Sequence, residues 1–450
     1  MAVQACKSNF FIEKTNKVLL QVIVKTKPKV LMFGWEFPPV INGGLGVACL
    51  GLCKAMAPMV KLKMVIPKTS PDYAVNYMEL IGLNAIDVSK LKSEGKKKHY
   101  KRFSKPNYFN ISLTPYLSFP GEEEINRVQY EVHNSDLQHF EIDELYGGDV
   151  IRKVLEFSKI SVKLAATKEF DIIHAHDWMT FLPGMEIKAA TGKPLVLHVH
   201  SLEYDRSGPE NKSWVYQLEK RAMEYADAII PVSRYTGTII KNHYGISPDK
   251  IFPVHNGIEA VNHSKLKRIT SEKIVIFLGR LTMQKGPEYY FEAAKKVLNH
   301  YPNVRFVLAG TGELMKGIME RAAEARIGHR FHTTGFLTKD KVNDLLAVAD
   351  VYCMPSVSEP FGLSVVEAVQ YGIPTIMSKQ SGASEVIHGS LKMDYWDVDK
   401  LASYIISLLE FPTLRKELVD EAYVDLKKIS WVTTAKQVLK VYDKLLSEKK

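Results

Sequence analysis

The sequence predicts an α/β protein built from two doubly wound domains that face each other across a cleft. Two observations predict this fold. Strands and helices alternate along the chain twice over, and the strands are continuous apolar runs, which is typical of parallel sheets covered on both faces. The chain is also 450 residues long and 46% hydrophobic, which is more than one core usually holds and enough for two.

The first half opens with a buried strand at residues 29–34 and a helix at residues 44–59. Further strands are predicted at 60–66, 172–175, 195–199 and 228–232, and further helices at 181–190, 214–225 and 234–244. Residues 67–150 carry Gly, Pro and Lys clusters without a regular period. We interpret them as insertions rather than as a further domain.

The second half repeats the unit. Strands are predicted at 274–278, 305–309, 331–333, 351–354 and 375–377, and helical stretches separate them. The polar stretch at 257–271 predicts the hinge. The predicted organisation is an N-terminal extension (1–28), two domains (29–258 and 259–430), and a C-terminal amphipathic helix (431–450) that packs back on the N-terminal domain.

The composition predicts a soluble cytoplasmic protein. No run of about 18 apolar residues appears, so no membrane-spanning helix is expected. The first 28 residues contain interrupting charges and no small-residue cleavage pattern, which fits a signal peptide poorly. The four cysteines form neither a disulfide framework nor a zinc spacing, and this favours a reducing compartment.

The net charge of +10 is partly local, because seven cations crowd residues 92–105. A solvated loop is the simpler interpretation, and peripheral contact with an anionic membrane surface is the alternative. Nucleic-acid binding is not predicted, since no recognised motif accompanies the charge.

Residues 356–374 have the pattern of a ligand-binding helix start. Gly362 and Leu363 would offer unpaired backbone N–H groups at the positive end of a helix, where phosphate binds. Glu359 would lie in the loop before this helix, and Glu367 one turn inside it. Carboxylates repel phosphate, so both are better explained as acceptors for sugar or ribose hydroxyls, although they could also be ordinary surface acids.

The loop after the strand at 274–278 supplies the matching cations. Gly279 ends the strand, Arg280 and Lys285 follow it, and Pro287 starts a helix. Open α/β sheets bind ligands at the carboxyl ends of their strands. The two cations are therefore predicted to clamp a diphosphate.

Five motifs in this order resemble those of the retaining glycosyltransferases of GT-B architecture, which consist of two Rossmann-like domains, and more narrowly the glycogen and starch synthases and related family 4 type sugar-nucleotide transferases. The resemblance covers almost the whole chain from residue 28 onward. The motifs are the segments 34–39 with 43–46, 174–178, 199–203, 279–286 and 359–367.

The resemblance implies a role for each matching residue. Gly43 and Gly44 would let the first strand-helix loop approach the donor phosphates, and Asp177 would face the acceptor sugar. The backbone carbonyl of His200 would lie beside the anomeric centre of the donor. Arg280 and Lys285 would neutralise the leaving diphosphate, while Glu359 would bind the donor sugar and Glu367 the ribose. The N-terminal domain would then bind the acceptor and the C-terminal domain the nucleotide sugar.

The implied reaction moves a hexosyl group from an ADP- or UDP-linked sugar to a glucan. No cofactor and no metal are expected, because the two cations supply the positive charge. One position departs from the polyglucan synthases, since Ile41 stands where they carry a lysine. Transfer to another carbohydrate, as in sucrose, trehalose, cell-surface or lipid-linked transferases, is the alternative, and a non-catalytic sugar-nucleotide-binding protein is a third.

Overall fold

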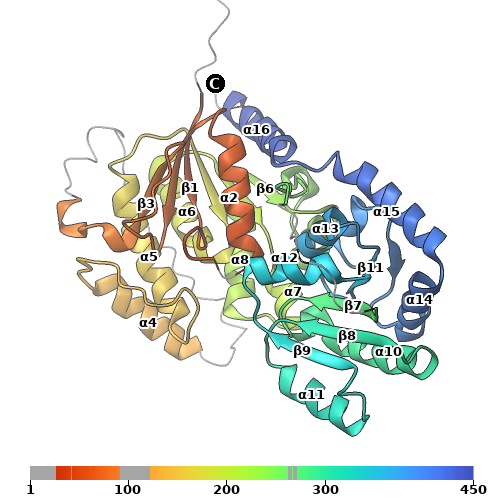
Figure 1. Cartoon of the computed structure of the whole chain (residues 1–450). Helices are drawn as coiled ribbons and strands as arrows, with labels where there is room; N and C mark the ends of the chain where they lie inside the picture. Colours follow the sequence, from red (N-terminus) through yellow and green to blue (C-terminus); the bar gives the residue numbers. More distant parts are fainter. Residues whose placement is uncertain (1–26, 42, 92–121, 262–265, 267–270, 449–450) are drawn as a thin grey trace, which may run out of the picture.

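The computed structural model describes residues 27–41, 43–91, 122–261, 266 and 271–448. It contains two β-sheets of six strands each, and every strand pair in the described residues is parallel (Figure 1). Helices cover both sheets, which confirms the predicted α/β architecture. The basic stretch at 92–105 and residues 1–26 of the N-terminal extension lie outside the described residues.

The first sheet has the strand order β3-β2-β1-β4-β5-β6. Its strands are β1 (Lys29–Phe33), β2 (Lys61–Ile66), β3 (Glu79–Gly82), β4 (Ile172–His176), β5 (Leu195–Val199) and β6 (Ala228–Pro231). The helices of this half are α2 (Gly44–Met56), α4 (Glu122–Asn134), α5 (Val150–Ala165), α6 (Trp178–Thr191), α7 (Glu203–Ser207), α8 (Trp214–Tyr225) and α9 (Arg234–Tyr244).

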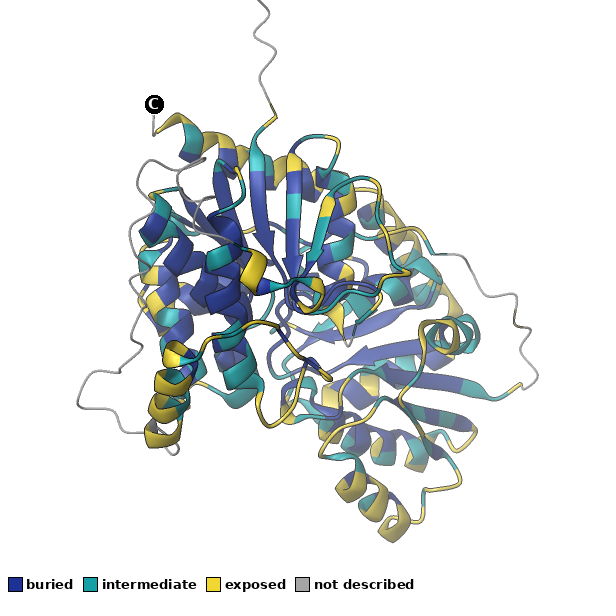
Figure 2. Ribbon diagram, turned by 90° about the vertical axis from the view of Figure 1, so that its left-hand side faces the viewer, coloured by how far each residue is buried: buried dark blue, intermediate teal, exposed yellow. Residues whose placement is uncertain are grey.

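The alternation of side chains along each strand builds two cores, one on each face of the sheet. In β1, Leu31 and Phe33 enter the core under α5 and α6, whereas Val30 and Met32 enter the core under α2. A strand that is buried on both faces consists mainly of apolar residues. For this reason the central strands could be read from the sequence, and Figure 2 shows them buried along most of their length.

The second sheet has the strand order β12-β11-β10-β7-β8-β9. Its strands are β7 (Lys273–Leu278), β8 (Val304–Ala309), β9 (Phe331–Gly335), β10 (Val351–Met354), β11 (Thr375–Ser378) and β12 (Leu391–Met393). Its helices are α10 (Pro287–His300), α11 (Met315–Glu324), α12 (Lys339–Val348), α13 (Leu363–Gln370), α14 (Val398–Glu410) and α15 (Pro412–Leu426). The short helices η4 (Met283–Lys285) and η5 (Gly382–Glu385) lie in its loops.

Several elements differ from the sequence prediction, among them the helices α4, α5 and α7, which were not predicted. The edge strands β3 and β12 were not predicted, because they are only four and three residues long and each has a single buried residue. Part of the region that we interpreted as insertions therefore completes the first sheet. Helix α6 begins at Trp178, three residues before the predicted start, because the chain turns directly after β4 at Asp177.

The last helix, α16 (Trp431–Ser447), leaves the second half of the chain and packs against α2. Trp431, Val438 and Tyr442 belong to the same core as β1 and α2. The indole of Trp431 lies over Gly51, where a Cβ would come within 2.2 Å of the ring. Among the described helices, none is long and apolar enough to cross a bilayer.

Candidate functional site

Two loops of the second sheet join at their tips and bring opposite charges together. The side-chain amide of Gln284 in η4 donates a hydrogen bond to the carbonyl of Ser358, 3.1 Å away. As a result, Lys285 Nζ lies 2.5 Å from a carboxylate oxygen of Glu359, whose residue is only 6% exposed. Gly279 borders the same place, since a Cβ there would lie 3.8 Å from Lys285 Cγ. The predicted phosphate cation and the predicted sugar-binding carboxylate thus form one ion pair.

The N-terminus of α13 opens beside this pair. Gly362 precedes the helix with a φ of 100°, which favours glycine, and a Cβ there would lie 3.3 Å from Glu359 Cγ. Glu367 lies one turn inside the helix, where burial raises its pKa and Lys339 lowers it. The predicted donor residues of the C-terminal half therefore surround one helix start.

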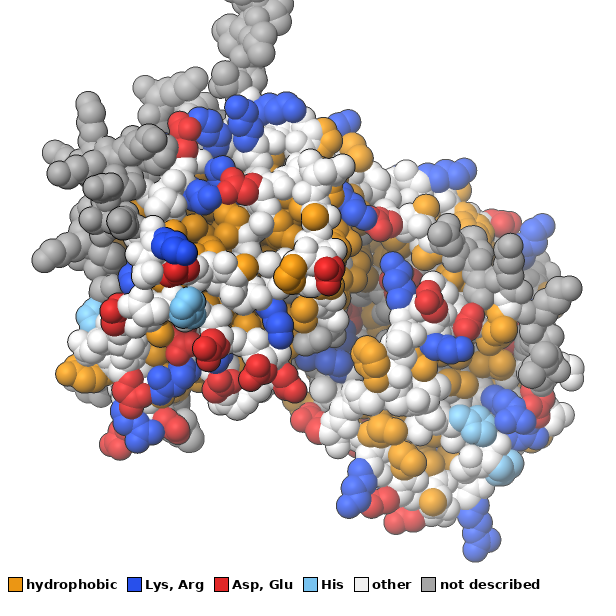
Figure 3. Space-filling view, turned by 60° about the vertical axis from the view of Figure 1, so that its left-hand side comes forward, with side chains coloured by type: hydrophobic (Ala, Val, Ile, Leu, Met, Phe, Trp, Pro, Cys, Tyr) orange, Lys and Arg blue, Asp and Glu red, His pale blue; other side chains and the backbone are white. Residues whose placement is uncertain are grey.

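The first residue of α2 faces this helix start from the other half of the chain. A Cβ at Gly44 would lie 3.7 Å from a methyl group of Leu363. The N-termini of α2 and α13 consequently meet across the boundary between the two sheets, and a space-filling view shows a furrow between the two lobes (Figure 3).

The N-terminus of α2 already holds a carboxylate, which the sequence analysis did not anticipate. Glu36 accepts hydrogen bonds from the N–H groups of Gly43 at 3.1 Å and Gly46 at 3.3 Å. Its other oxygen accepts from the hydroxyl of Tyr146, 2.5 Å away. In this structure the N–H of Gly43 thus binds Glu36.

Tyr146 lies where the predicted residues of both halves meet. Burial raises the pKa of its hydroxyl, as do Glu36 and Asp177, whereas Arg280 lowers it. The positive charge of Arg280, in the C-terminal half, therefore reaches Tyr146 in the N-terminal half and favours the ionised form of its hydroxyl. Arg280 is itself exposed, and it makes no hydrogen bond or ion pair with another residue that the structure describes.

Asp177 holds the turn after β5 in place. Its residue is 4% exposed and has a φ of 58°, an uncommon conformation for a residue with a side chain. One carboxylate oxygen accepts from the N–H groups of His200 at 2.6 Å and Ser201 at 3.3 Å. Burial raises the pKa of Asp177 to about 7, against the lowering effect of these hydrogen bonds. This oxygen faces the protein backbone, whereas the sequence analysis predicted that Asp177 faces the acceptor sugar.

Four histidines stack at the carboxyl ends of β4 and β5. Nδ1 of His176 lies 2.9 Å from Nε2 of His200, and Nε2 of His174 lies 3.2 Å from Nδ1 of His198. Burial lowers the pKa of all four, that of His200 to about 3, so the rings are neutral near pH 7.

The side chains in the described residues that could hold a metal ion are these histidines with Cys49. Three consecutive pairs of the stack have ring planes within 16° to 23° of parallel. The ring nitrogens of two pairs face each other at hydrogen-bond distance, His176 with His200 and His174 with His198. A metal ion bound between these nitrogens would replace those hydrogen bonds.

Hydrogen bonds join the two halves beside the Lys285–Glu359 pair. The hydroxyl of Ser358 contacts Asp205 of α7 at 2.5 Å and the hydroxyl of Tyr235 of α9 at 3.0 Å. Further along the boundary, the carboxylate of Glu385 accepts from the N–H groups of Arg234 and Tyr235 at the start of α9. The halves are thus held together next to the candidate site.

Sequence reasoning did not assign roles to Glu36, Tyr146, Asp205 or Ser358. Glu36 belongs to the motif at residues 34–39. Its spacing of seven residues to Gly43 is the local feature that could have indicated their contact. The other three residues depend on contacts between segments more than 100 residues apart, for which a single sequence holds no signal.

The chain matches two sequence families. Residues 259–425 match the family described as glycosyl transferases group 1, and residues 117–261 match glycosyltransferase family 4. An uncharacterized glycosyltransferase from Methanocaldococcus jannaschii is 26% identical over 92% of this chain and 97% of the relative. An alpha-maltose-1-phosphate synthase from Mycolicibacterium smegmatis is 30% identical over 61% of this chain and 79% of the relative.

Solved structures share the fold. A sucrose-phosphate synthase from Thermosynechococcus elongatus superimposes with a TM-score of 0.68 at 17% identity, covering 94% of this chain and 100% of that one. The catalytic domain of starch synthase IV from Arabidopsis thaliana, bound to ADP and acarbose, gives a TM-score of 0.66 at 16% identity with the same coverage. The two family matches and the 30% identity to the maltose-1-phosphate synthase, together with this fold, show that the chain belongs to the glycosyltransferases of GT-B architecture.

Proposed function

We propose that this protein is a retaining, metal-independent hexosyltransferase that moves a hexosyl group, in the first instance glucose, from a nucleoside-diphosphate sugar to a glucan. The observation that carries the proposal is the meeting of Lys285, Glu359 and the glycine-opened start of α13 at one point opposite Gly44. The similar starch synthase structure, which is bound to ADP and acarbose, supports the glucan assignment.

In this proposal, each site residue has the role that stabilises the charge developing next to it during the reaction. Breaking the bond to the nucleoside diphosphate puts negative charge on the phosphate, which Arg280, Lys285 and the N–H groups of Gly362 and Leu363 stabilise. Positive charge on the sugar ring is stabilised by the backbone carbonyl of His200. Glu359 binds the hydroxyls of the donor sugar, and Glu367 binds those of the ribose.

The acceptor hydroxyl attacks on the face that the diphosphate leaves, and the leaving phosphate takes its proton. The new bond therefore keeps the anomeric configuration of the donor. No covalent intermediate is required, and the two cations do the electrostatic work that a metal ion performs in other transferases.

The experiment is a panel of ADP-, UDP- and GDP-linked sugars, scored for release of nucleoside diphosphate and for lengthening of glycogen or maltooligosaccharides. The anomeric configuration of the first product is read by NMR, and rates are compared with and without a chelator. Inversion, or loss of activity with the chelator that divalent metal restores, would contradict the proposed mechanism.

Arg280→Ala and Lys285→Ala should each lower kcat by about two orders of magnitude, since removing one preorganised donor costs roughly 3 kcal/mol in the transition state. Lys316→Ala, at an exposed position on α11, is the matched control and should leave kcat unchanged. Rates near wild type in both site variants would remove the diphosphate clamp from the mechanism.

A second acceptor class is a sugar phosphate, which the names of two similar proteins favour, a maltose-1-phosphate synthase and a sucrose-phosphate synthase. The panel therefore includes glucose 1-phosphate and fructose 6-phosphate. Transfer to either compound without glucan lengthening would replace the glucan assignment.

A further inference from the structure

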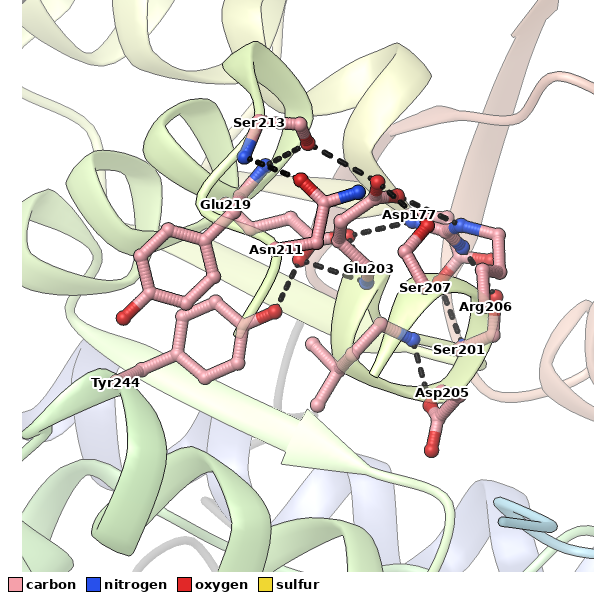
Figure 4. Close-up of polar contacts among 12 residues, drawn as sticks. Asp177, Ser201, Glu203, Asp205, Arg206, Ser207, Asn211, Ser213, Glu219 and Tyr244 are labelled. Atoms are coloured by element: carbon pink, nitrogen blue, oxygen red, sulfur yellow. Dashed lines mark hydrogen bonds and ion pairs between the residues drawn. The ribbon is translucent and has the colours of Figure 1, made fainter. Parts of the chain in front are cut away.

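The guanidinium of Arg206 ties together the turn that follows β5. Nη1 donates to the hydroxyl of Ser201 at 2.8 Å, Nε to the carboxylate of Glu203 at 3.1 Å, and Nη2 to the carboxylate of Glu219 at 2.9 Å (Figure 4). The side chain is 25% exposed, so most of it lies inside the protein.

Glu219 anchors the same turn to α8. Its side chain is 1% exposed, and its two oxygens accept from the N–H of Glu203 at 3.0 Å each and from the hydroxyl of Tyr244 at 2.5 Å. The second carboxylate oxygen of Glu203, which Arg206 does not contact, accepts from the hydroxyls of Ser207 and Ser213. Every charged group of this network is thus held by at least two partners (Figure 4).

The network holds residues 200–203 together with Asp177, which binds the N–H groups of His200 and Ser201 and whose charge acts on Arg206. It also fixes the helix that carries Asp205, whose carboxylate contacts the hydroxyl of Ser358 next to Glu359. Arg206 therefore contacts Ser201, the residue after His200. It also belongs to α7, whose Asp205 contacts Ser358 of the other half.

Stability alone explains such a network poorly. Burying charged groups costs several kcal/mol for each ion, and apolar replacements of buried ion pairs are often as stable or more stable. What a saturated network of directed bonds provides is fixed geometry, and a shift of about 1 Å at a reacting group can cost roughly 100-fold in rate.

We propose that Arg206 is a positioning residue for glycosyl transfer, which holds the turn 200–203 and the helix α7 so that His200 and Ser358 keep their places on the two sides of the site. The proposal rests on the role of His200 given above. In this proposal Arg206 acts through the turn and the helix, and not by contact with a substrate.

The test compares Arg206→Gln and Arg206→Lys with wild type, using the sugar nucleotide that the panel identifies. Arg206→Gln should lower kcat about 30- to 100-fold while the KM for the donor changes less than about threefold, because binding groups remain and alignment is lost. Lysine keeps the charge and should recover part of the loss. Arg152→Gln, which removes an exposed ion pair with Glu131 in the same half, is the control and should match wild type.

Two further measurements separate positioning from folding. Millimolar methylguanidinium should restore part of the kcat of Arg206→Ala and should not affect Arg152→Gln. If the arginine variants do not fold, Glu219→Gln replaces them in the test, because it keeps the shape of the side chain and removes the charge that Arg206 contacts. It should show the same loss of kcat.

An unchanged kcat in a folded Arg206→Gln would overturn the proposal, as would a kcat loss that follows the fraction unfolded. If wild type turns over no sugar nucleotide, the proposed function fails by itself. Hydrogen exchange then decides the positioning role: faster exchange confined to residues 200–207 in Arg206→Gln supports it, and unchanged exchange there overturns it.

Discussion

The buried histidine stack should make the stability of the fold depend on pH, and His198 shows the direction and the size of this dependence. His198 is 1% exposed on β5, and Nδ1 of its ring lies near Nε2 of His174. Burial lowers the pKa of His198 well below its usual value, as do His200 and His176. The unfolded chain therefore binds a proton at this histidine that the folded chain does not bind.

The change in the free energy of unfolding with pH follows from proton linkage. A histidine whose pKa is lowered by folding makes no difference above its unfolded pKa of about 6.5, and it reduces stability as the pH falls from there towards the folded pKa. Between about pH 7.5 and about pH 5.5, the unfolded state gains RT ln(11/1.1), or about 1.4 kcal/mol, from this one residue.

The substitution His198→Asn removes this titration and keeps a polar group where Nδ1 was. The unfolding free energy of the variant relative to wild type should rise by about 1.4 kcal/mol between about pH 7.5 and about pH 5.5, measured in urea by tryptophan fluorescence. Val196→Ala in the same buried strand should lower stability equally at both pH values, because neither side chain titrates. An equally constant offset for His198→Asn would refute the reasoning.

Two further outcomes test how the parts of the chain are joined. Gly51→Ala should destabilise the protein by about 1–3 kcal/mol in urea unfolding, because its methyl group meets the ring of Trp431, whereas Gly317→Ala in α11 meets nothing within 4 Å and should stabilise by up to about 1 kcal/mol. Glu385→Ala should cost about 1 kcal/mol and speed hydrogen exchange of the Arg234 and Tyr235 amides, since a carboxylate at a helix start satisfies N–H groups that otherwise face solvent. Equal effects of the two glycine variants, or unchanged amide exchange, would contradict these assignments.

The sequence predicted those elements whose pattern is local. The bounds of β5, α8 and α9 agree with the structure because an apolar run that only His198 interrupts marks the strand, and Ser213 and Ser233 cap the two helices. The edge strand β3 escaped prediction because its burial comes from one neighbouring strand and not from its own composition.

For the candidate site, the sequence indicated which residues are chemically suitable but not how they pair. Lys285 and Glu359 were assigned to different parts of a donor, and their direct contact across 74 positions follows from the tips of two loops meeting through Gln284. Glu36 at the start of α2 was missed because a carboxylate beside a glycine pair has no fixed sequence signature. The roles assigned to these residues stay predictions until the variants are measured.

The contact between Lys285 and Glu359 bears on how a donor would enter the site. Glu359 is nearly buried and also accepts a hydrogen bond from Ser356, so its carboxylate is costly to leave without a cation. On the proposed assignment, a diphosphate that attracts Lys285 removes that cation, and the hydroxyls of the donor sugar then satisfy Glu359. A ligand that carries the phosphates without the sugar would leave the carboxylate unpaired. The ion pair thus gives a physical reason why one site would recognise the diphosphate and the sugar of a sugar nucleotide together, and why Lys285 and Glu359 would act as a unit.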